Sequence, residues 1–305
     1  MNEDLNLLFK NHPLAKDIDG ISISFIDFST LSFEEVTFRS NGKIFSNSRD
    51  KIYYDLASVT KPLTIGLIQF LSPDLLQEEH FRLLLNHHSG IPAWGLLSQA
   101  NWKQQISSYQ INNSIAEYSD FGAIRAQIEF EKRTNKNLYH ECSKYWDSEL
   151  IHWLKVDSKL CLKTGERLFR PIVGEVHDPN AWVIKSPVSH AGLFSTISGL
   201  SKTLIYLERE FKICDYFIQK FITLKPDRFI NAWDTVTNKS TTLAGDLCGD
   251  FTVGHLGFTG TSFWIDCQKK KGVVILSNAT RDGWYNKSNL NEMRKKISNI
   301  FWKKS

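Results

Sequence analysis

Hydrophobic and polar positions follow two different periods along the chain. Between Gly20 and Phe45 they alternate, as in "GISISFID" and "SFEEVTF", and the turn dipeptide Asn41-Gly42 interrupts them. This alternation predicts two or three antiparallel strands. Strand signals return towards the C-terminal end, in "HLGFTGTSFWID" and "KGVVILSNAT". An apolar stripe over residues 289–304 predicts a last helix that packs on a sheet, with a membrane surface as the alternative place for it.

The segment from Ser58 to about Lys225 has helical spacing instead. The helices predicted there are 59–71, 79–87, 119–132, 143–155 and 200–210. The order of strands, helices, strands and helix predicts a two-lobed α+β fold. Both chain ends would build one antiparallel sheet with flanking helices, around an inserted and mainly helical lobe. We expect a single domain over 1–305, with a sheet lobe from 1–57 and 226–305 and a helical lobe from 58–225.

Composition and charge exclude several classes of protein. Of the 305 residues, 42% are hydrophobic and 23% are charged, which is ordinary for a globular protein. The net charge of +4 comes without a long basic stripe, so nucleic-acid binding is not expected. The first residues do not resemble a secretory signal, and there is no apolar run long enough for a membrane span. These features predict a cytoplasmic protein, with a mature exported form as the alternative. They do not indicate an oligomeric state.

The cysteines indicate neither disulfides nor a metal site. There are five of them, widely spaced and without a C-x-x-C pair. An odd number at such spacing argues against a disulfide framework and against structural zinc. We expect reduced and mostly buried thiols, and neither a metal nor a cofactor.

The first candidate for chemistry is a serine followed three residues later by a lysine. This pattern occurs at Ser40/Lys43, Ser48/Lys51 and Ser58/Lys61. Only Ser58 opens a stretch of helical spacing, in which positions i and i+3 share a face. Ser58 could simply cap a helix while Lys61 is solvated. Alternatively, Ser58 is a nucleophile and Lys61 its base, which requires that burial or a second cation lower the lysine pKa.

Further stretches change the balance between these alternatives. They are "LASVTKPLT", "LLLNHHSGIPAW", "YSDFGAIRAQIEFEK", "VHDPNAW" with "SHAGLFSTISGLSKTL", and "GHLGFTGTSFWID". In order and rough spacing they resemble the serine β-lactamase and penicillin-binding-protein-like superfamily. The resemblance is strongest to its class C-like branch of esterases, D-aminopeptidases and D,D-carboxypeptidases. It extends from about Leu56 to Asn278, which is most of the chain.

The resemblance implies roles for three catalytic side chains. Ser58 would be the nucleophile, and Lys61 with Tyr118 would manage its proton. Tyr118 matches the tyrosine of the Tyr-x-Asn motif, where it would relay a proton from Ser58 to the leaving group. Asp120 stands where many relatives have asparagine. A carboxylate there would pair with Lys61 and keep it protonated, which shifts the proton transfer towards Tyr118. Without the resemblance, Tyr118 would be read as a core tyrosine before a helix.

The resemblance also implies a strand beside the nucleophile. His255-Leu256-Gly257 matches the Lys-Thr-Gly motif, with histidine in place of the cation. Such a histidine can hold a carboxylate or tune the tyrosine, but its charge depends on pH. Leu256 lacks the usual hydroxyl, and Gly257 would let a substrate lie close to the strand. The backbone N–H groups of Ser58 and Phe258 would form the oxyanion hole.

These residues predict a serine hydrolase that acts through an acyl-enzyme on a small ester or amide. A short-chain ester, a D-amino-acid peptide or amide, a peptidoglycan fragment and a β-lactam all fit the mechanism. Leu256 favours an esterase or peptidase over an efficient β-lactamase. The alternative is a binding or scaffold protein with a silent site, which the departures at Asp120 and Leu256 permit.

Several aromatic residues and histidines stay outside this assignment. We expect His87, His88, His177 and His190 to be structural, the last two in a loop that flanks the cleft. Trp94 and Trp182 could line the cleft or pack in the core.

Overall fold

The computed structural model describes residues 2–283 and 287–303. Within these residues the strands form an antiparallel sheet of eight in the order β3-β2-β1-β13-β12-β11-β10-β9. Their bounds are Phe45–Ser48, Ser32–Ser40, Gly20–Asp27, Lys271–Ser277, Ser262–Asp266, Thr252–Leu256, Trp233–Thr235 and Phe229–Ile230, in that order. The N-terminal β1 pairs with the C-terminal β13, from Ile21 opposite Ser277 to Asp27 opposite Lys271. The sheet is therefore built from both ends of the chain, as predicted.

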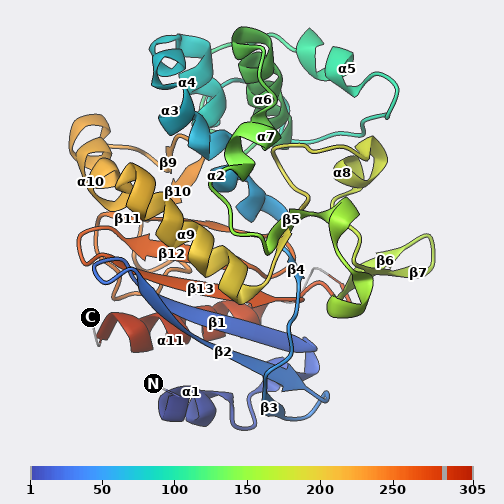
Figure 1. Ribbon diagram of the computed structural model, residues 1–305, viewed down its shortest axis with the longest axis vertical. Coiled ribbons are helices and arrows are strands. Elements are labelled where there is room, and N and C mark those ends of the chain that lie inside the picture. The colour runs from blue at the N-terminus through green and yellow to red at the C-terminus, as the bar shows by residue number, and fades with distance from the viewer. Residues whose placement is uncertain (1, 284–286, 304–305) are drawn as a thin grey trace.

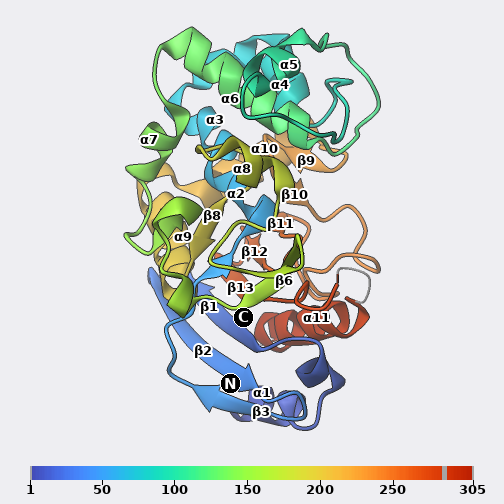
Figure 2. The same cartoon turned by 90° about the vertical axis from the view of Figure 1, so that its right-hand side faces the viewer.

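Helices occur on both faces of this sheet and at one end of the molecule. Their bounds are α1 Asn2–Phe9, α2 Thr60–Leu63, α3 Ile68–Leu71, α4 Glu79–Leu85, α5 Trp102–Ser108, α6 Asp120–Thr134, α7 Leu138–Ser143, α8 Pro179–Ile184, α9 Ile197–Phe211, α10 Ile213–Leu224 and α11 Ser288–Lys303. Helix α9 packs against β1, β2 and β13 on one face, and α1 and α11 lie on the other (Figure 1). Helices α3 to α6 gather at the end farthest from α1 (Figure 2). The mixed α+β class with flanking helices is confirmed.

The strand β1 shows how alternation serves a sheet that is covered twice. Ile21, Ile23 and Phe25 join the core beneath α1 and α11. Ile26 belongs to the larger core on the α9 side, and Ser22 is also buried. Successive side chains of a strand point to opposite faces, so both faces of β1 are buried. The apolar face of α11 supplies Leu290, Met293 and Ile297 to the same core, so its prediction as a sheet-packing helix is confirmed.

Two small sheets connect the helical part to the large sheet. One has the order β4-β8-β5, with bounds Tyr54–Asp55, Leu193–Ser195 and Leu150–His152. The other is the hairpin of β6 (Lys163–Arg167) and β7 (Arg170–Val173), which projects from the body of the molecule (Figure 1). The first sheet carries the chain into the turn that holds Ser58.

Two predicted helices are wrong in detail. The helix predicted over 59–71 is broken at Thr64, whose φ of −123° and ψ of −90° leave the helical region. The helix predicted over 143–155 does not form, because residues 150–152 pair with β8 as strand β5. Spacing alone cannot separate a short helix from a short paired strand, and here pairing in the folded chain decides. The helices predicted at 79–87, 119–132 and 200–210 are present as α4, α6 and α9. The division into lobes at 57/58 and 225/226 stays a prediction.

The cysteines behave as the sequence suggests. All five are free, four of them buried, and Cys161 is half-buried. Burial raises the pKa of Cys142 well above its usual value and that of Cys161 to about 12. Both are therefore unreactive thiols at neutral pH.

Candidate functional site

The chain places Ser58 on a tight turn between a strand and a helix. Strand β4 ends at Asp55, residues 57–59 form one turn of 3-10 helix, and α2 starts at Thr60. Ser58 is half-buried, whereas the Lys61 side chain is fully buried one turn further along. The Lys61 ammonium donates to Ser58 Oγ at 3.1 Å. The juxtaposition predicted from the i, i+3 spacing is therefore present.

The two other serine–lysine pairs have different partners. The Ser40 hydroxyl donates to the carbonyl of Ala15. Ser48 Oγ accepts from the Asp50 amide at 3.0 Å, and Lys51 pairs with Glu149 at 2.5 Å. Among the described residues, only the third pair thus combines a serine with a buried lysine.

Lys61 uses its ammonium as a donor to three acceptors. Besides Ser58 it donates to Asp120 Oδ1 at 2.6 Å and to the carbonyl of His190 at 3.1 Å. Burial alone lowers the pKa of Lys61, but the Asp120 carboxylate, helped by Tyr118, outweighs it and raises the pKa above its ordinary value. A lysine in this setting is a cation at neutral pH, as expected from Asp120.

Tyr118 stands immediately before α6 and against the same lysine. Ser119 caps that helix by accepting from the Gly122 amide at 2.8 Å, which directs the preceding tyrosine inward. Lys61 Nζ lies 4.7 Å from the centroid of the Tyr118 ring. The phenol oxygen is buried and, among the described residues, has no hydrogen-bond partner. Burial raises the pKa of Tyr118, and the nearby Lys61 ammonium only partly offsets this rise, so the phenol keeps its proton.

His255 occupies the end of β11 as a neutral imidazole. Its Nδ1 lies 2.8 Å from the carbonyl of Leu256, so Nδ1 carries the hydrogen and Nε2 keeps a lone pair. Burial, together with the Lys61 ammonium, lowers the pKa of His255 to about 3. The ring centroid is 5.9 Å from that of Tyr118. His255 therefore supplies an acceptor beside the tyrosine and no cation.

Gly257 lies against the chain that leads to Ser58. A Cβ at this position would lie 1.9 Å from Thr261 Oγ1 and 2.5 Å from the carbonyl of Leu56. The close neighbour of the glycine is thus the chain that leads to Ser58, and the close approach of substrate to this residue stays a prediction. Thr261 also donates to the Leu56 carbonyl at 2.9 Å, which fixes the β11–β12 turn beside the nucleophile. Ser58 and Phe258, whose amides are the expected oxyanion donors, both line the same cavity.

The cavity in front of Ser58 has a volume of about 360 Å³ and mainly apolar walls. Trp94, Pro179, Ala191 and Phe258 provide apolar surface. Its acidic side chains are Asp120 and Asp178, and neither lysine nor arginine occurs among its described lining residues. Trp182 lies outside it and donates to Glu175 at 2.9 Å. A cleft with apolar walls and few polar groups is typical of small-molecule sites.

Three histidines contribute more than the sequence indicated. His190 gives its carbonyl to Lys61, and its ring lies 2.9 Å from Asp178 Oδ1. His177 lines the cavity. The His87 ring packs on Tyr118 at 4.8 Å between centroids, and its Nδ1 accepts from the Ser119 amide at 3.1 Å. Burial lowers the pKa of His87 well below its usual value, so the ring is neutral. In the sequence, the only signal for these roles is that the three histidines lie close to the motifs. Most of them act through backbone groups, which a sequence pattern does not reveal.

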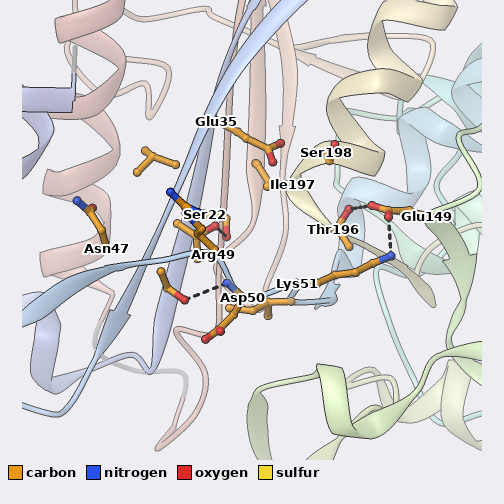
Figure 3. A pocket seen from close by; sticks show the side chains of 14 residues that line it. Ser22, Glu35, Asn47, Arg49, Asp50, Lys51, Glu149, Thr196, Ile197 and Ser198 are labelled. Carbon is orange, nitrogen blue, oxygen red and sulfur yellow. Dashed lines mark hydrogen bonds and ion pairs between the residues drawn. The ribbon is translucent and has the colours of Figure 1, made fainter.

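A second and larger cavity of about 670 Å³ lies between β2, β3 and the start of α9. Two of its charged side chains, Lys51 and Glu149, pair with each other, and Glu149 also accepts from the Thr196 hydroxyl (Figure 3). It contains none of the predicted site residues. The described part of the chain has no cluster of three potential metal ligands and no helix long and apolar enough to cross a membrane.

Comparisons with known proteins identify the fold. No family model and no curated protein matches the chain. It is similar to the solved structure of a D-amino acid amidase from Ochrobactrum anthropi, with 12% identity over 100% of both chains and a TM-score of 0.62. A β-lactamase from Mycobacterium bovis matches with 16% identity over 94% of this chain and 95% of its own, at a TM-score of 0.58. A penicillin-binding protein homologue from Pyrococcus abyssi has the same identity and TM-score, over 98% of this chain and 76% of its own.

The chain has the serine β-lactamase and penicillin-binding-protein fold. At these identities the likeness establishes the fold, and the chemistry must be argued from the side chains in the cleft.

Proposed function

We propose that the protein is a serine hydrolase that forms an acyl-enzyme on Ser58. The observation that carries the proposal is the hydrogen bond from the buried Lys61 ammonium to Ser58 Oγ at the mouth of an apolar cavity. A serine held beside a buried cation and a buried phenol is the arrangement that acyl transfer needs.

The protonation states favour a relay through Tyr118. Lys61 is a cation and Tyr118 a phenol, so neither is a free base in the resting site. As Ser58 Oγ attacks the carbonyl carbon, its proton passes to Tyr118 while the phenol proton passes to the leaving group. The bond to the leaving group breaks and the acyl group remains on Ser58. Water then attacks the ester, and its proton returns through Tyr118 to Ser58 Oγ.

In this proposal, two backbone amides and the Lys61 cation stabilise the transition state electrostatically. The amides of Ser58 and Phe258, two residues that line the cavity, would hold the developing oxyanion, and the Lys61 cation lies next to the attacking oxygen. Asp120 keeps that cation charged during the reaction. The departure from asparagine at position 120 is thus compatible with catalysis.

The charges of the cleft favour substrates without a carboxylate. His255 is neutral, Asp178 is acidic, Leu256 brings no hydroxyl, and the Lys61 cation is already paired with Asp120. His190 holds the pKa of Asp178 at about 2 despite its burial, so this group is ionised. We infer a neutral or amine-bearing ester or amide with an apolar acyl group. The amidase among the similar structures fits this class, whereas a carboxypeptidase or β-lactamase substrate would bring an unpaired negative charge.

Mass spectrometry of the intact protein tests the proposal. The protein is incubated with a fluorophosphonate and separately with benzylpenicillin, as wild type, Ser58→Ala and Ser48→Ala. We expect one fluorophosphonate adduct on wild type and Ser48→Ala, none on Ser58→Ala, and at least tenfold slower reaction with penicillin. The Ser48 variant is the matched control because it removes a serine from an equivalent motif outside the cleft. Absence of any adduct on folded wild-type protein would overturn the hydrolase assignment in favour of a binding protein.

A further inference from the structure

Asp55 is a buried carboxylate next to the nucleophile that none of the motif residues explains. It ends strand β4 and is 1% exposed. Oδ1 accepts from the amide of Ala57 at 2.9 Å, and Oδ2 accepts from the amide of His177 at 2.6 Å. One side chain thus joins the turn that carries Ser58 to a cleft wall far along the chain.

The first of these bonds acts on a strained residue. Ala57 has a φ of +46°, in the left-handed region that side chains with a Cβ disfavour. Strained backbone persists only where its surroundings hold it, and it is common at catalytic sites. Asp55 Oδ1 holds the Ala57 amide in this conformation, and Ser58 is the next residue. The direction of the nucleophile therefore depends on the carboxylate.

The second bond leads back to the nucleophile by another route. His177 is followed by Asp178, and Asp178 Oδ1 accepts from the His190 ring at 2.9 Å. The His190 carbonyl accepts from Lys61, and Lys61 donates to Ser58. Together with short stretches of chain, these bonds close a ring around the cleft. Asp55 is the member of the ring that spans from the Ser58 turn to the opposite wall.

The β11–β12 turn, which forms a third wall of the cleft, is hydrogen-bonded to the same strand. Thr259 donates to the backbone carbonyl of Asp55 at 2.6 Å, and Thr261 donates to that of Leu56 at 2.9 Å. Phe258, which carries the second expected oxyanion amide, lies in the turn that these threonines fix. Residues 55 and 56 thus join the Ser58 turn, the His177–Asp178 wall and the β11–β12 turn.

We propose that Asp55 is a positioning residue: its carboxylate holds the Ser58 turn and the His177–Asp178 wall at a fixed separation, so that bound substrate meets the nucleophile in register. The inference rests on the proposed function, because it assigns Asp55 a role in the acylation of Ser58. A misplacement of about 1 Å at a reacting centre can cost about a hundredfold in rate.

The chain offers a matched control for this carboxylate. Asp266 is 0% exposed and accepts from the amides of Gly249 at 2.9 Å and Lys269 at 3.1 Å. It has the same burial and the same kind of bonds as Asp55. It ends β12 and does not line the cleft. A purely structural role for a buried aspartate should therefore appear equally in both positions.

The experiment compares Asp55→Asn with Asp266→Asn. Asparagine keeps the shape but turns one acceptor oxygen into an N–H donor, so one of the two amides loses its partner. We expect the second-order rate of Ser58 labelling by the fluorophosphonate to fall at least tenfold in Asp55→Asn and to stay within twofold in Asp266→Asn. Hydrogen exchange at the amides of Ala57 and His177 should become faster in the first variant alone. Labelling of Asp55→Asn within twofold of wild type, or unchanged exchange at both amides, would overturn the inference.

The two readouts separate this inference from the proposed function. Absence of labelling in wild type itself would remove the hydrolase assignment and the catalytic part of this inference together, while hydrogen exchange would still measure whether Asp55 holds the two segments. Slow exchange in wild type that becomes fast in Asp55→Asn supports the clamp in either case.

Wild-type protein allows a further measurement that needs no substitution. Burial raises the pKa of Asp55 to about 7, and the neighbouring groups are Asp178, Arg167, His177 and Cys161. The pKa values of Asp178 and Cys161 are about 2 and 12, that of His177 is lowered, and Arg167 stays a cation. Protonation removes one acceptor lone pair from the clamp, so labelling should slow as the pH falls below about 7. A labelling rate that is constant from pH 5 to pH 8 would contradict the clamp.

Discussion

At the scale of single residues, the charge of His255 bears on which substrates the proposed site would accept. The imidazole is buried, neutral and committed through Nδ1 to the carbonyl of Leu256. The sequence identified the position but left its charge open, because a histidine titrates near neutral pH and only burial shows which form is present. Here burial and the Lys61 ammonium keep the His255 imidazole neutral.

Replacing this imidazole by a cation should widen the substrate range. In His255→Lys an ammonium would stand beside the cleft and offer a partner to a substrate carboxylate. We expect acylation by benzylpenicillin to become at least tenfold faster, with fluorophosphonate labelling changed by less than threefold, both measured from intact mass against time. His80→Lys, at a partly exposed histidine of α4, is the control and should change neither rate. An unchanged penicillin rate in folded His255→Lys would show that the charge at this position does not limit binding.

At the scale of elements, the sequence predicted long regular segments and failed where the folded chain decides. The strands near both ends and the helices α4, α6 and α9 follow from periodicity. Strand β5 lies in a segment whose spacing predicts a helix, because its three residues gain their structure only by pairing with β8. The hairpin of β6 and β7 also went unpredicted. Its two turn residues, Leu168 and Phe169, have φ values of +50° and +62°, where glycine and asparagine are usual.

This hairpin turn gives a prediction about stability. Leu168 and Phe169 are 78% and 102% exposed, so their side chains contribute little packing and strain the backbone. Replacing them by Asn-Gly should raise the free energy of unfolding by about 1–2 kcal/mol, measured by urea denaturation, since Arg167 and Arg170 keep their register. Labelling of Ser58 should not change. Leu96→Asn, at an equally exposed residue without a positive φ, is the control and should leave stability within about 0.5 kcal/mol. If the Asn-Gly replacement and Leu96→Asn raised the free energy of unfolding equally, the gain would come from removing exposed apolar surface and not from relieving backbone strain.

At the scale of the whole molecule, the site is assembled from segments that only the fold brings together. Ser58, Lys61, Tyr118 and Asp120 could be expected to lie together because their side chains match motifs. Ser58, Tyr118 and Asp120 line one cavity, and the buried Lys61 donates to Ser58 and Asp120. The partners that fix them could not be predicted. Asp55 binds two backbone amides and His190 offers a backbone carbonyl, and backbone groups leave no signature in a sequence. Such contacts depend on which segments meet, and that is a property of the complete sheet.

The same carboxylate should make the stability of the whole molecule depend on pH. The pKa of Asp55 rises from 3.8 to about 7 on folding, so the folded chain holds a proton that the unfolded chain releases between these values. Its contribution to stability is full below pH 3.8 and is lost as the pH rises through about 7. An asparagine side chain does not titrate, so the unfolding free energy of wild type minus that of Asp55→Asn should fall by about 4 kcal/mol at most between pH 4 and pH 8. Urea denaturation at several pH values measures the difference, and a constant difference would contradict the prediction.

Because the clamp requires the ionised form of Asp55, labelling of Ser58 should rise over the same pH range. Stability and activity would then change in opposite directions with pH, as expected for a buried charge that serves the site at the expense of the fold.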